Sequence, residues 1–215
     1  MSLFIFILST SLLIFISFYQ YKKKAQTSKE KGKMGEKQVQ KAFFKGLNHK
    51  YHIFNNVTFR DEYQYTTQID HIVLSRYGLF VLEVKNYSGW IYAYKHKKNW
   101  IQKFPSKQIE FQNPIFQNHR HINVLKFILD AKELSNDIHS VVIFSNNSTF
   151  KTPFPEQVFQ ENLWIPYIKS FKNIVFTEQQ ISYIKDQITN HQLPVSKQTN
   201  HIHIKSIQKR LNEQN

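Results

Sequence analysis

The chain opens with an apolar run that a lysine-rich stretch follows. Residues 3–18 read LFIFILSTSLLIFISF and carry no charge. As a helix this run would measure about 24 Å, slightly less than the roughly 30 Å hydrocarbon core of a bilayer, and Tyr19 and Tyr21 extend it into the interface. A signal peptide would need a basic segment before the run and a small-residue cleavage site after it, and a buried core helix fits poorly with three following lysines. The pattern predicts a transmembrane anchor over residues 1–21.

The lysine-rich stretch holds most of the excess charge. The whole chain has a formal net charge of +14, and residues 22–50, with ten Lys and two Glu, account for +8 of it. Residues 22–33 lack apolar periodicity and are predicted to be a basic linker near anionic lipid headgroups. By the positive-inside rule, this block places the chain after the anchor on the cytoplasmic side and the amino terminus outside. Residues 3–24 would then contact membrane lipid, and the charge supports a membrane more than a nucleic-acid substrate.

From Met34 the spacing becomes helical. Val39, Phe43 and Leu47 recur every four residues, which predicts an amphipathic helix of about 14 residues. Glu36 falls on the same face as these apolar residues. Since an acidic residue in the first turn is also favoured by the helix dipole, a purely local role for Glu36 stays open.

The next segments alternate as β-strands do. Residues 51–59, 68–75 and 79–84 read as strands, with a turn at Arg76-Tyr77-Gly78. A turn centred between Arg76 and Tyr77 would set Asp70 opposite Glu83 and bring Lys85 to the same side of the hairpin. Two opposed carboxylates destabilise a sheet unless something compensates them. Mg²⁺ or Mn²⁺ would do so, although a solvent-exposed, salt-bridged face remains an alternative.

The remaining pattern predicts alternating strands and helices. A second hairpin is expected at 89–94 and 99–104, a helix beginning at Asn113-Pro114, and a buried parallel strand at 140–145. Short strands are predicted at 163–167 and 173–176, then a helix with Thr177 as its N-cap. The tail, residues 191–215, is basic and polar, and a short amphipathic helix is predicted at its end. On a strand, His201 and His203 could both contact a metal ion, but two imidazoles without further ligands make a poor site. The chain contains no cysteine, which excludes disulfides, Cys-ligated zinc and thiol catalysis.

Several motifs occur in an order that is more specific than the acidic–lysine pattern alone. They are Gly35-Glu36, Thr67-Gln68-Ile69-Asp70-His71-Ile72, the run from Gly78 to Tyr87, Gly89, Trp100, Asn113-Pro114, Gln117-Asn118 and His121. In this order they resemble the nuclease-related domain (NERD) family, over residues 33–129 and more weakly to residue 188. The resemblance implies a restriction-endonuclease-like PD-(D/E)xK fold, in which a mixed central sheet is flanked by helices, over residues 34–190.

The resemblance also implies roles for individual residues. Asp70 and Glu83 would bind Mg²⁺ or Mn²⁺ together with the main-chain carbonyl of Val84. Lys85 would be the catalytic lysine, and Glu36 would act as a further ligand or as a base. Gln117 would point towards this site and hold a water or a phosphate.

These observations together predict a membrane-anchored, metal-dependent nuclease. It would hydrolyse phosphodiester bonds of nucleic acid, with DNA the expected substrate, on the cytoplasmic side of the cell membrane. The alternative is a non-catalytic nucleic-acid-binding or scaffold module tethered to the membrane. The charge of the segment after residue 50 does not decide between the two.

Overall fold

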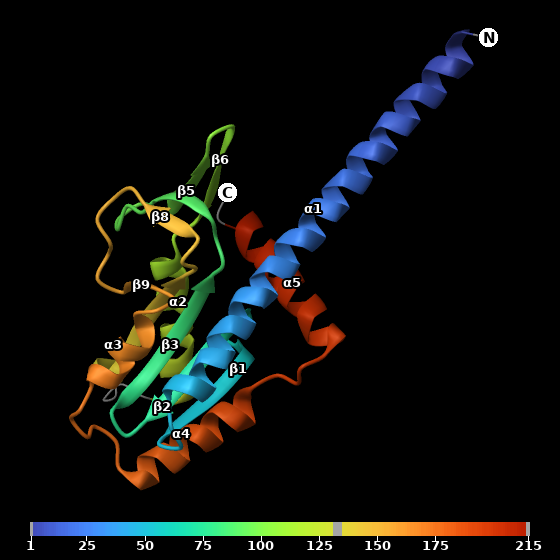
Figure 1. Ribbon diagram of the computed structural model, residues 1–215. Helices are drawn as coiled ribbons and strands as arrows, with labels where there is room; N and C mark the ends of the chain where they lie inside the picture. Colours follow the sequence, from blue (N-terminus) through green and yellow to red (C-terminus); the bar gives the residue numbers. More distant parts are fainter. Residues whose placement is uncertain (1, 131–134, 214–215) are drawn as a thin grey trace.

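The computed structural model describes residues 2–130 and 135–213, which form a mixed α/β domain with a long amino-terminal helix (Figure 1). The helices and the one 3₁₀ turn are α1 (Ser2–Gly46), α2 (Pro114–Ile128), η1 (Ser135–Asp137), α3 (Trp164–Ser170), α4 (Glu178–His191) and α5 (Lys197–Asn212). The strands are β1 (Tyr51–Arg60), β2 (Thr66–Ser75), β3 (Gly78–Lys85), β4 (Gly89–Tyr92), β5 (Asn99–Phe104), β6 (Lys107–Gln112), β7 (Ile138–Phe144), β8 (Ser148–Phe150) and β9 (Val158–Gln160).

The described strands form two mixed sheets rather than the single central sheet that was predicted. The larger sheet has the order β1-β2-β3-β7-β9, antiparallel from β1 to β3 and parallel from β3 to β9. The smaller sheet has the order β6-β5-β4-β8, and its β4–β8 pair is parallel. The predicted parallel strand at 140–145 is confirmed as β7, which lies between β3 and β9.

The predicted register of the first hairpin is confirmed. Ser75 pairs with Gly78 and His71 with Leu82, as a two-residue turn at Arg76-Tyr77 requires. Gly78 has a φ of 148°, which favours glycine at the end of this turn.

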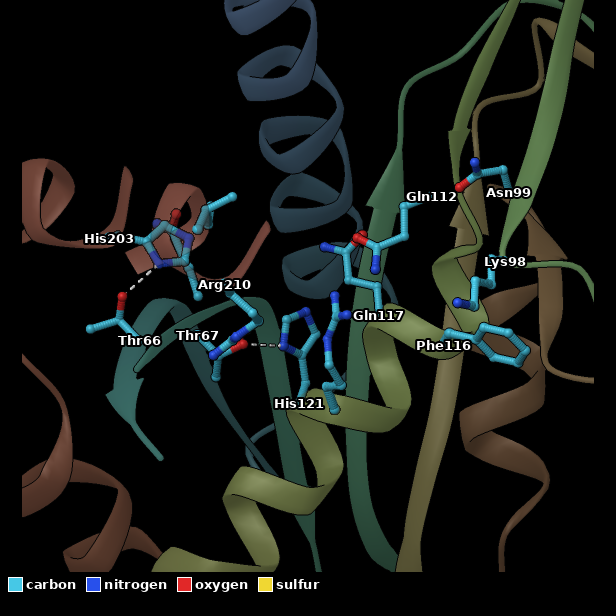
Figure 2. Close-up of a pocket in the computed structure, with 13 residues that line it drawn as sticks. Thr66, Thr67, Lys98, Asn99, Gln112, Phe116, Gln117, His121, His203 and Arg210 are labelled. Atoms are coloured by element: carbon cyan, nitrogen blue, oxygen red, sulfur yellow. Dashed lines mark hydrogen bonds between the residues drawn. The ribbon is translucent and has the colours of Figure 1, made fainter. Parts of the chain in front are cut away.

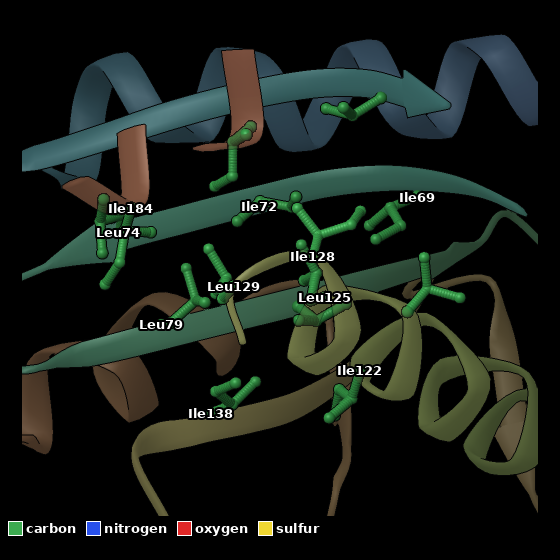
Figure 3. Close-up of a cluster of buried hydrophobic side chains, with 14 of the residues drawn as sticks. Ile69, Ile72, Leu74, Leu79, Ile122, Leu125, Ile128, Leu129, Ile138 and Ile184 are labelled. Carbon is green, nitrogen blue, oxygen red and sulfur yellow. The ribbon is translucent and has the colours of Figure 1, made fainter. Parts of the chain in front are cut away.

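Successive residues of this sheet face two different helical layers. On one face Ile72, Leu74 and Leu79 pack against residues of α2 and α4, including Leu125 and Ile184 (Figure 3). On the other face the core cluster joins residues of the sheet to α1 and α3; its members include Val39, Phe43, Val73, Phe80, Trp164 and Ile168. A third cluster, around Trp100 and Phe144, joins the two sheets. Because side chains alternate across a strand, each of the two helical layers covers one apolar face.

Helix α1 differs from the prediction. It is continuous from Ser2, so residues 22–33 are helical rather than an irregular linker, and its first half extends away from the domain (Figure 1). The predicted transmembrane anchor is not confirmed: within the part of the chain that the structure describes, no helix is both long and apolar enough to cross a membrane. The side chains of residues 1–15, which carry most of the apolar run, lie outside that description.

Two predicted strands are wrong. Residues 163–167 lie largely in helix α3, whose Trp164 and Ile168 are four residues apart and both buried against α1. Residues 173–176 form no strand, because the main-chain N–H groups of Val175 and Phe176 both donate to the carbonyl of Arg76 at the hairpin turn. The pair His201 and His203 lies in helix α5 and not on a strand.

Candidate functional site

The acidic–lysine residues meet where the β2–β3 ladder ends. The last pair of that ladder is His71 with Leu82, and one residue further on Asp70 Oδ2 accepts a hydrogen bond of 2.8 Å from the main-chain N–H of Val84. Glu83 and Lys85 continue β3 and pair with β7. The antiparallel pairing therefore carries Asp70 to the start of the Glu83-Val84-Lys85 segment, as the hairpin register predicted.

Glu83 lies between two nitrogen groups. Its Oε1 accepts a hydrogen bond of 2.5 Å from Lys85 Nζ, and its Oε2 lies 3.2 Å from His121 Nε2. Lys85 Nζ also donates to Gln117 Oε1 at 3.0 Å, which ties β3 to α2. On the other side of the imidazole, His121 Nδ1 lies 2.8 Å from Thr67 Oγ1 (Figure 2). These four contacts form one continuous polar network.

The exposure of Glu83 and Lys85 decides whether they form a solvent-exposed, salt-bridged face. The side chain of Glu83 is 3% exposed and that of Lys85 15% exposed. A solvent-exposed, salt-bridged face is therefore wrong. A buried ion pair of this kind has a desolvation cost that can exceed its Coulombic gain, so its burial is weak evidence that it stabilises the fold.

The two carboxylates have opposite protonation tendencies. Burial and the nearby charge of Glu83 hold the pKa of Asp70 well above its usual range, against the hydrogen bond from Val84. Burial also raises the pKa of Glu83, but the Lys85 ammonium and His121 outweigh it and bring that pKa to about 2. For Lys85 burial lowers the pKa, but the charges of Glu83, Tyr87 and Asp70 and the hydrogen bond to Glu83 together outweigh burial, so the pKa is raised. Two neighbouring carboxylates with divergent pKa values are typical of functional sites.

Glu36 approaches the same site from helix α1. It is half-buried, and its pKa is raised by burial and by the charge of Glu83, while a hydrogen bond with Asn56 lowers it. The preceding Gly35 permits this approach: a Cβ there would lie 2.6 Å from Cβ of Asn86, which follows β3. Gly35 thus lets α1 pack closely enough against the sheet for the charge of Glu83 to raise the pKa of Glu36.

The structure brings the predicted residues into one place. Asp70, Glu83, Lys85 and Gln117 form the centre, and Glu36 lies within electrostatic range of it. For Val84 the observed contact is its main-chain N–H to Asp70; its role as a carbonyl ligand stays a prediction. Among the described residues, no three His, Asp or Glu side chains are grouped as a ready-made metal site.

Two functional side chains of α2 received no role from sequence reasoning. His121 follows Gln117 by four residues, so both share a helix face, and this spacing was the available signal. Asn118 is fully buried and donates through Nδ2 to the carbonyl of Val81 and to Ser140 Oγ, both at 2.8 Å. Asn118 therefore fixes α2 over β3 and β7 and holds Gln117 and His121 above the carboxylates.

A cavity of about 620 Å³ opens on the α2 side of this network. Gln117 and His121 line it, with Thr66 and Thr67 from β2 and residues of α5 opposite (Figure 2). The cavity adjoins the acidic–lysine cluster through Gln117 and His121, and residues of the carboxy-terminal helix α5 also line it. On that helix the sequence offered only the weak His201-x-His203 pair, and none of the predicted site residues lies there.

The fold is a mixed α/β domain, and its candidate site is a carboxylate–lysine pair at the end of a hairpin. The family model of the nuclease-related domain matches residues 31–145, which is more than half of the chain, and the chain belongs to this family. An uncharacterized protein of Bacillus anthracis is 42% identical over 109 residues; the match covers 51% of each chain, so the chain spans about half the length of that relative. No solved structure matches.

Proposed function

We propose that the site hydrolyses phosphodiester bonds of nucleic acid with the help of a divalent cation. The observation that carries this proposal is the meeting of the half-buried Asp70 and Lys85 with the buried Glu83, with Gln117 accepting a hydrogen bond from the lysine. Membership of the nuclease-related domain family supports it. The restriction-endonuclease-like assignment of the fold remains part of the proposal.

The chemistry of the donor set fits Mg²⁺ or Mn²⁺. Asp70 is a half-buried carboxylate beside a second, buried carboxylate, and one main-chain N–H is the hydrogen-bond donor that reaches it among the described residues. Hard cations bind carboxylate oxygens as ligands, and water and substrate phosphate complete the coordination of the ion. Asp70 and Glu83, with the carbonyl of Val84, would hold the ion. The ion would supply positive charge to the phosphodiester and acidify a nearby water.

The remaining residues have separable roles in this proposal. Lys85 neutralises charge that develops on a non-bridging phosphate oxygen, and Gln117 keeps its ammonium directed at that position. Glu36, whose pKa burial raises, takes the proton of the attacking water. The water oxygen forms a new bond to phosphorus while the bond to one sugar oxygen breaks. The leaving sugar oxygen takes a proton from solvent water, so the products are a phosphate monoester and a free hydroxyl group.

The test is cleavage by the purified full-length chain. Single-stranded and duplex DNA and RNA are incubated with Mg²⁺ or Mn²⁺, with EDTA as the metal-free condition. We expect cleavage that is lost in Asp70→Asn and Lys85→Met. The matched controls Asp186→Asn and Lys169→Met change exposed residues of α4 and α3 and should cleave normally. Absence of cleavage, or equal cleavage by the site variants, contradicts the proposal and favours a non-catalytic binding module.

We further propose that the chain acts at the cell membrane. The support is the apolar run of residues 3–18 and the lysines that follow it, which are typical of an anchor with the domain on the cytoplasmic side. Fractionation of cells that express the full chain tests this. The chain should sediment with membranes and resist extraction by high salt. A chain that salt releases would contradict an anchor.

A further inference from the structure

The cavity beside the site is built from two parts of the chain that lie far apart in sequence. Helix α2 and strand β2 supply one side and belong to the family match, while α5, beyond residue 145, supplies the other. Helix α5 is held in place by hydrogen bonds to β2: Thr66 N donates to Ser206 Oγ at 2.8 Å, and Thr66 Oγ1 lies 3.0 Å from His203 Nδ1. The far wall of the cavity is therefore a fixed element.

The charge in this cavity is of one sign. Lys98, Arg120 and Arg210 line it, and no Asp or Glu is present among the described residues that do so. Arg210 has an ion pair outside the cavity, with Asp61 at 3.1 Å. The half-buried side chain of Arg120 makes no hydrogen bond or ion pair within residues 2–130 and 135–213.

Arg120 is in an unfavourable position without an anion. Arg120 and Arg210 line the same cavity. Burial and the charge of Arg210 lower the pKa of the Arg120 guanidinium, and the charge of Glu83 only partly offsets them. A guanidinium normally pairs with a carboxylate or a phosphate in a two-pronged geometry. Two of them facing one cavity provide a receptor for a phosphate group.

The cavity also offers a surface for a base. Phe116 lines it and is 39% exposed, and the amide side chains of Asn99 and Gln112 line the same cavity (Figure 2). Aromatic rings that border a basic groove are the usual platforms on which unpaired bases stack. Phe116 lies in the first turn of the same helix that carries Gln117 and Arg120, so a base, its phosphate and the Lys85 network would meet within about one helical turn.

The size of the cavity limits the ligand. A volume of about 620 Å³ falls within the roughly 300–1,000 Å³ range of sites that enclose a small organic ligand. A base can enter such a space only when it is neither paired nor stacked in a duplex.

We propose that this cavity binds an unpaired nucleotide of a single-stranded nucleic acid, with Arg120 and Arg210 on its phosphate and Phe116 against its base. The proposal deepens the proposed function, on which it rests for the reaction that follows binding. It assigns half of the phosphate receptor to α5, outside the matched family domain. Binding itself requires neither the divalent cation nor hydrolysis.

The experiment measures binding of the full-length chain to a labelled single-stranded oligonucleotide by fluorescence anisotropy in EDTA, where no cleavage occurs. We expect Arg120→Gln to weaken binding about tenfold or more and to lower the salt dependence by about one charge. Lys98→Gln, whose side chain has no partner among the described residues, should weaken it less. The control Arg76→Gln removes the same charge at the distant hairpin turn and should bind as the wild type does.

Three outcomes separate this proposal from the proposed function. Binding that depends on Arg120 and survives Asp70→Asn supports the cavity, even if no condition yields cleavage. The cavity proposal is overturned if the Arg120→Gln variant keeps the wild-type thermal midpoint, binds with unchanged affinity and still cleaves. A duplex that binds as tightly as the single strand of the same sequence also overturns it.

Discussion

Lys85 Nζ donates a hydrogen bond of 3.0 Å to Gln117 Oε1, and this contact joins strand β3 to helix α2 across 32 residues of sequence. The same ammonium donates to Glu83 Oε1 at 2.5 Å. Two acceptors from two elements fix its direction. The position of the charge that the proposed reaction needs is therefore set by how α2 lies on the sheet.

Replacing Gln117 should lower catalysis through Lys85. Gln117→Leu removes the second acceptor and is expected to reduce kcat about 10- to 100-fold, the range typical of groups that orient a ligand or a catalytic residue. The KM should change little, and Gln117→Glu, which keeps an acceptor oxygen, should restore part of the rate. Steady-state kinetics checks this, with the exposed Gln179→Leu as control. A loss of thermal stability that matches the loss of rate would contradict a positioning role.

Asp70→Asn should stabilise the protein while it abolishes cleavage. Asp70 is half-buried beside Glu83, and its raised pKa means that its ionised form is disfavoured in the fold. The variant keeps an acceptor oxygen for Val84 and removes the charge, so the thermal midpoint at pH 7 should rise by a few degrees, since about 1 kcal/mol corresponds to roughly 2–4 °C at this size.

The size of this stabilisation depends on pH. The benefit of a neutral Asp70 is fully present in the wild type below the unfolded pKa of 3.8 and is lost as pH rises through the raised folded pKa. The gain of Asp70→Asn should therefore vanish at about pH 3 and be largest at neutral pH and above. Thermal melts across pH measure it. A variant less stable than the wild type at neutral pH would show that Asp70 is not an electrostatic cost.

A divalent cation should raise the thermal midpoint of the wild type but not that of Asp70→Asn. A ligand that binds only the folded chain contributes about 2.7 kcal/mol at 100 times its Kd, which corresponds to a midpoint shift of about 5–10 °C here. Mg²⁺ or Mn²⁺ should produce this shift, EDTA should reverse it, and Asp70→Asn should not show it. Differential scanning fluorimetry provides the measurement. An equal shift in Asp70→Asn would place the ion elsewhere.

Two glycines of α1 form a matched pair. A Cβ at Gly35 would meet Asn86 Cβ at 2.6 Å, whereas at Gly32 nothing lies within 4 Å. Gly35→Ala should cost about 1–3 kcal/mol and lower activity because it moves Glu36 away from the site. Gly32→Ala should gain up to about 1 kcal/mol from helix propensity. Urea unfolding compares them, and equal effects of the two changes would contradict the close packing of α1 on β3.

His139 should contribute an acid-dependent loss of stability. It packs between the rings of Phe80 and Phe171, with centroid distances of 5.1 and 4.4 Å, and burial lowers its pKa against the attraction of Asp137. A neutral imidazole is thus favoured in the fold, so its contribution is fully present above the unfolded pKa of 6.5 and is lost as pH falls below it.

The variant His139→Phe should lose this pH dependence. Its free energy of unfolding should change less between pH 7.5 and pH 5 than that of the wild type, as urea unfolding at both values would show. The exposed His96→Phe serves as control. A wild-type pH profile in His139→Phe would assign the acid sensitivity to another group.

Local signals predicted the elements next to the site. The Arg76-Tyr77 turn and the alternation around it gave the register that sets Asp70 against Glu83. Asn113 and Pro114 predicted the start of α2, where Asn113 accepts from the N–H of Ile115. Thr177 predicted the start of α4, which has a complete capping box. These predictions held because each depends on residues a few positions apart.

Other elements depend on partners far along the chain. The short apolar run at 163–167 is ambiguous by itself, and it becomes a helix because Trp164 and Ile168 are buried against α1. Segment 173–176 gives its main-chain hydrogen bonds to Arg76, about a hundred residues earlier. No local pattern contains that information.

The sequence by itself determined the hairpin, its register and the residue types that can bind a cation, because turn chemistry and side-chain alternation are local. The tertiary structure alone decided that Glu83 and Lys85 are buried, that His121 and Gln117 reach them from α2, and that Arg210 of α5 faces the cavity beside them. Burial and charge proximity arise from contacts between distant segments. The physical character of the site therefore appears only when α1, α2 and α5 are packed around the hairpin.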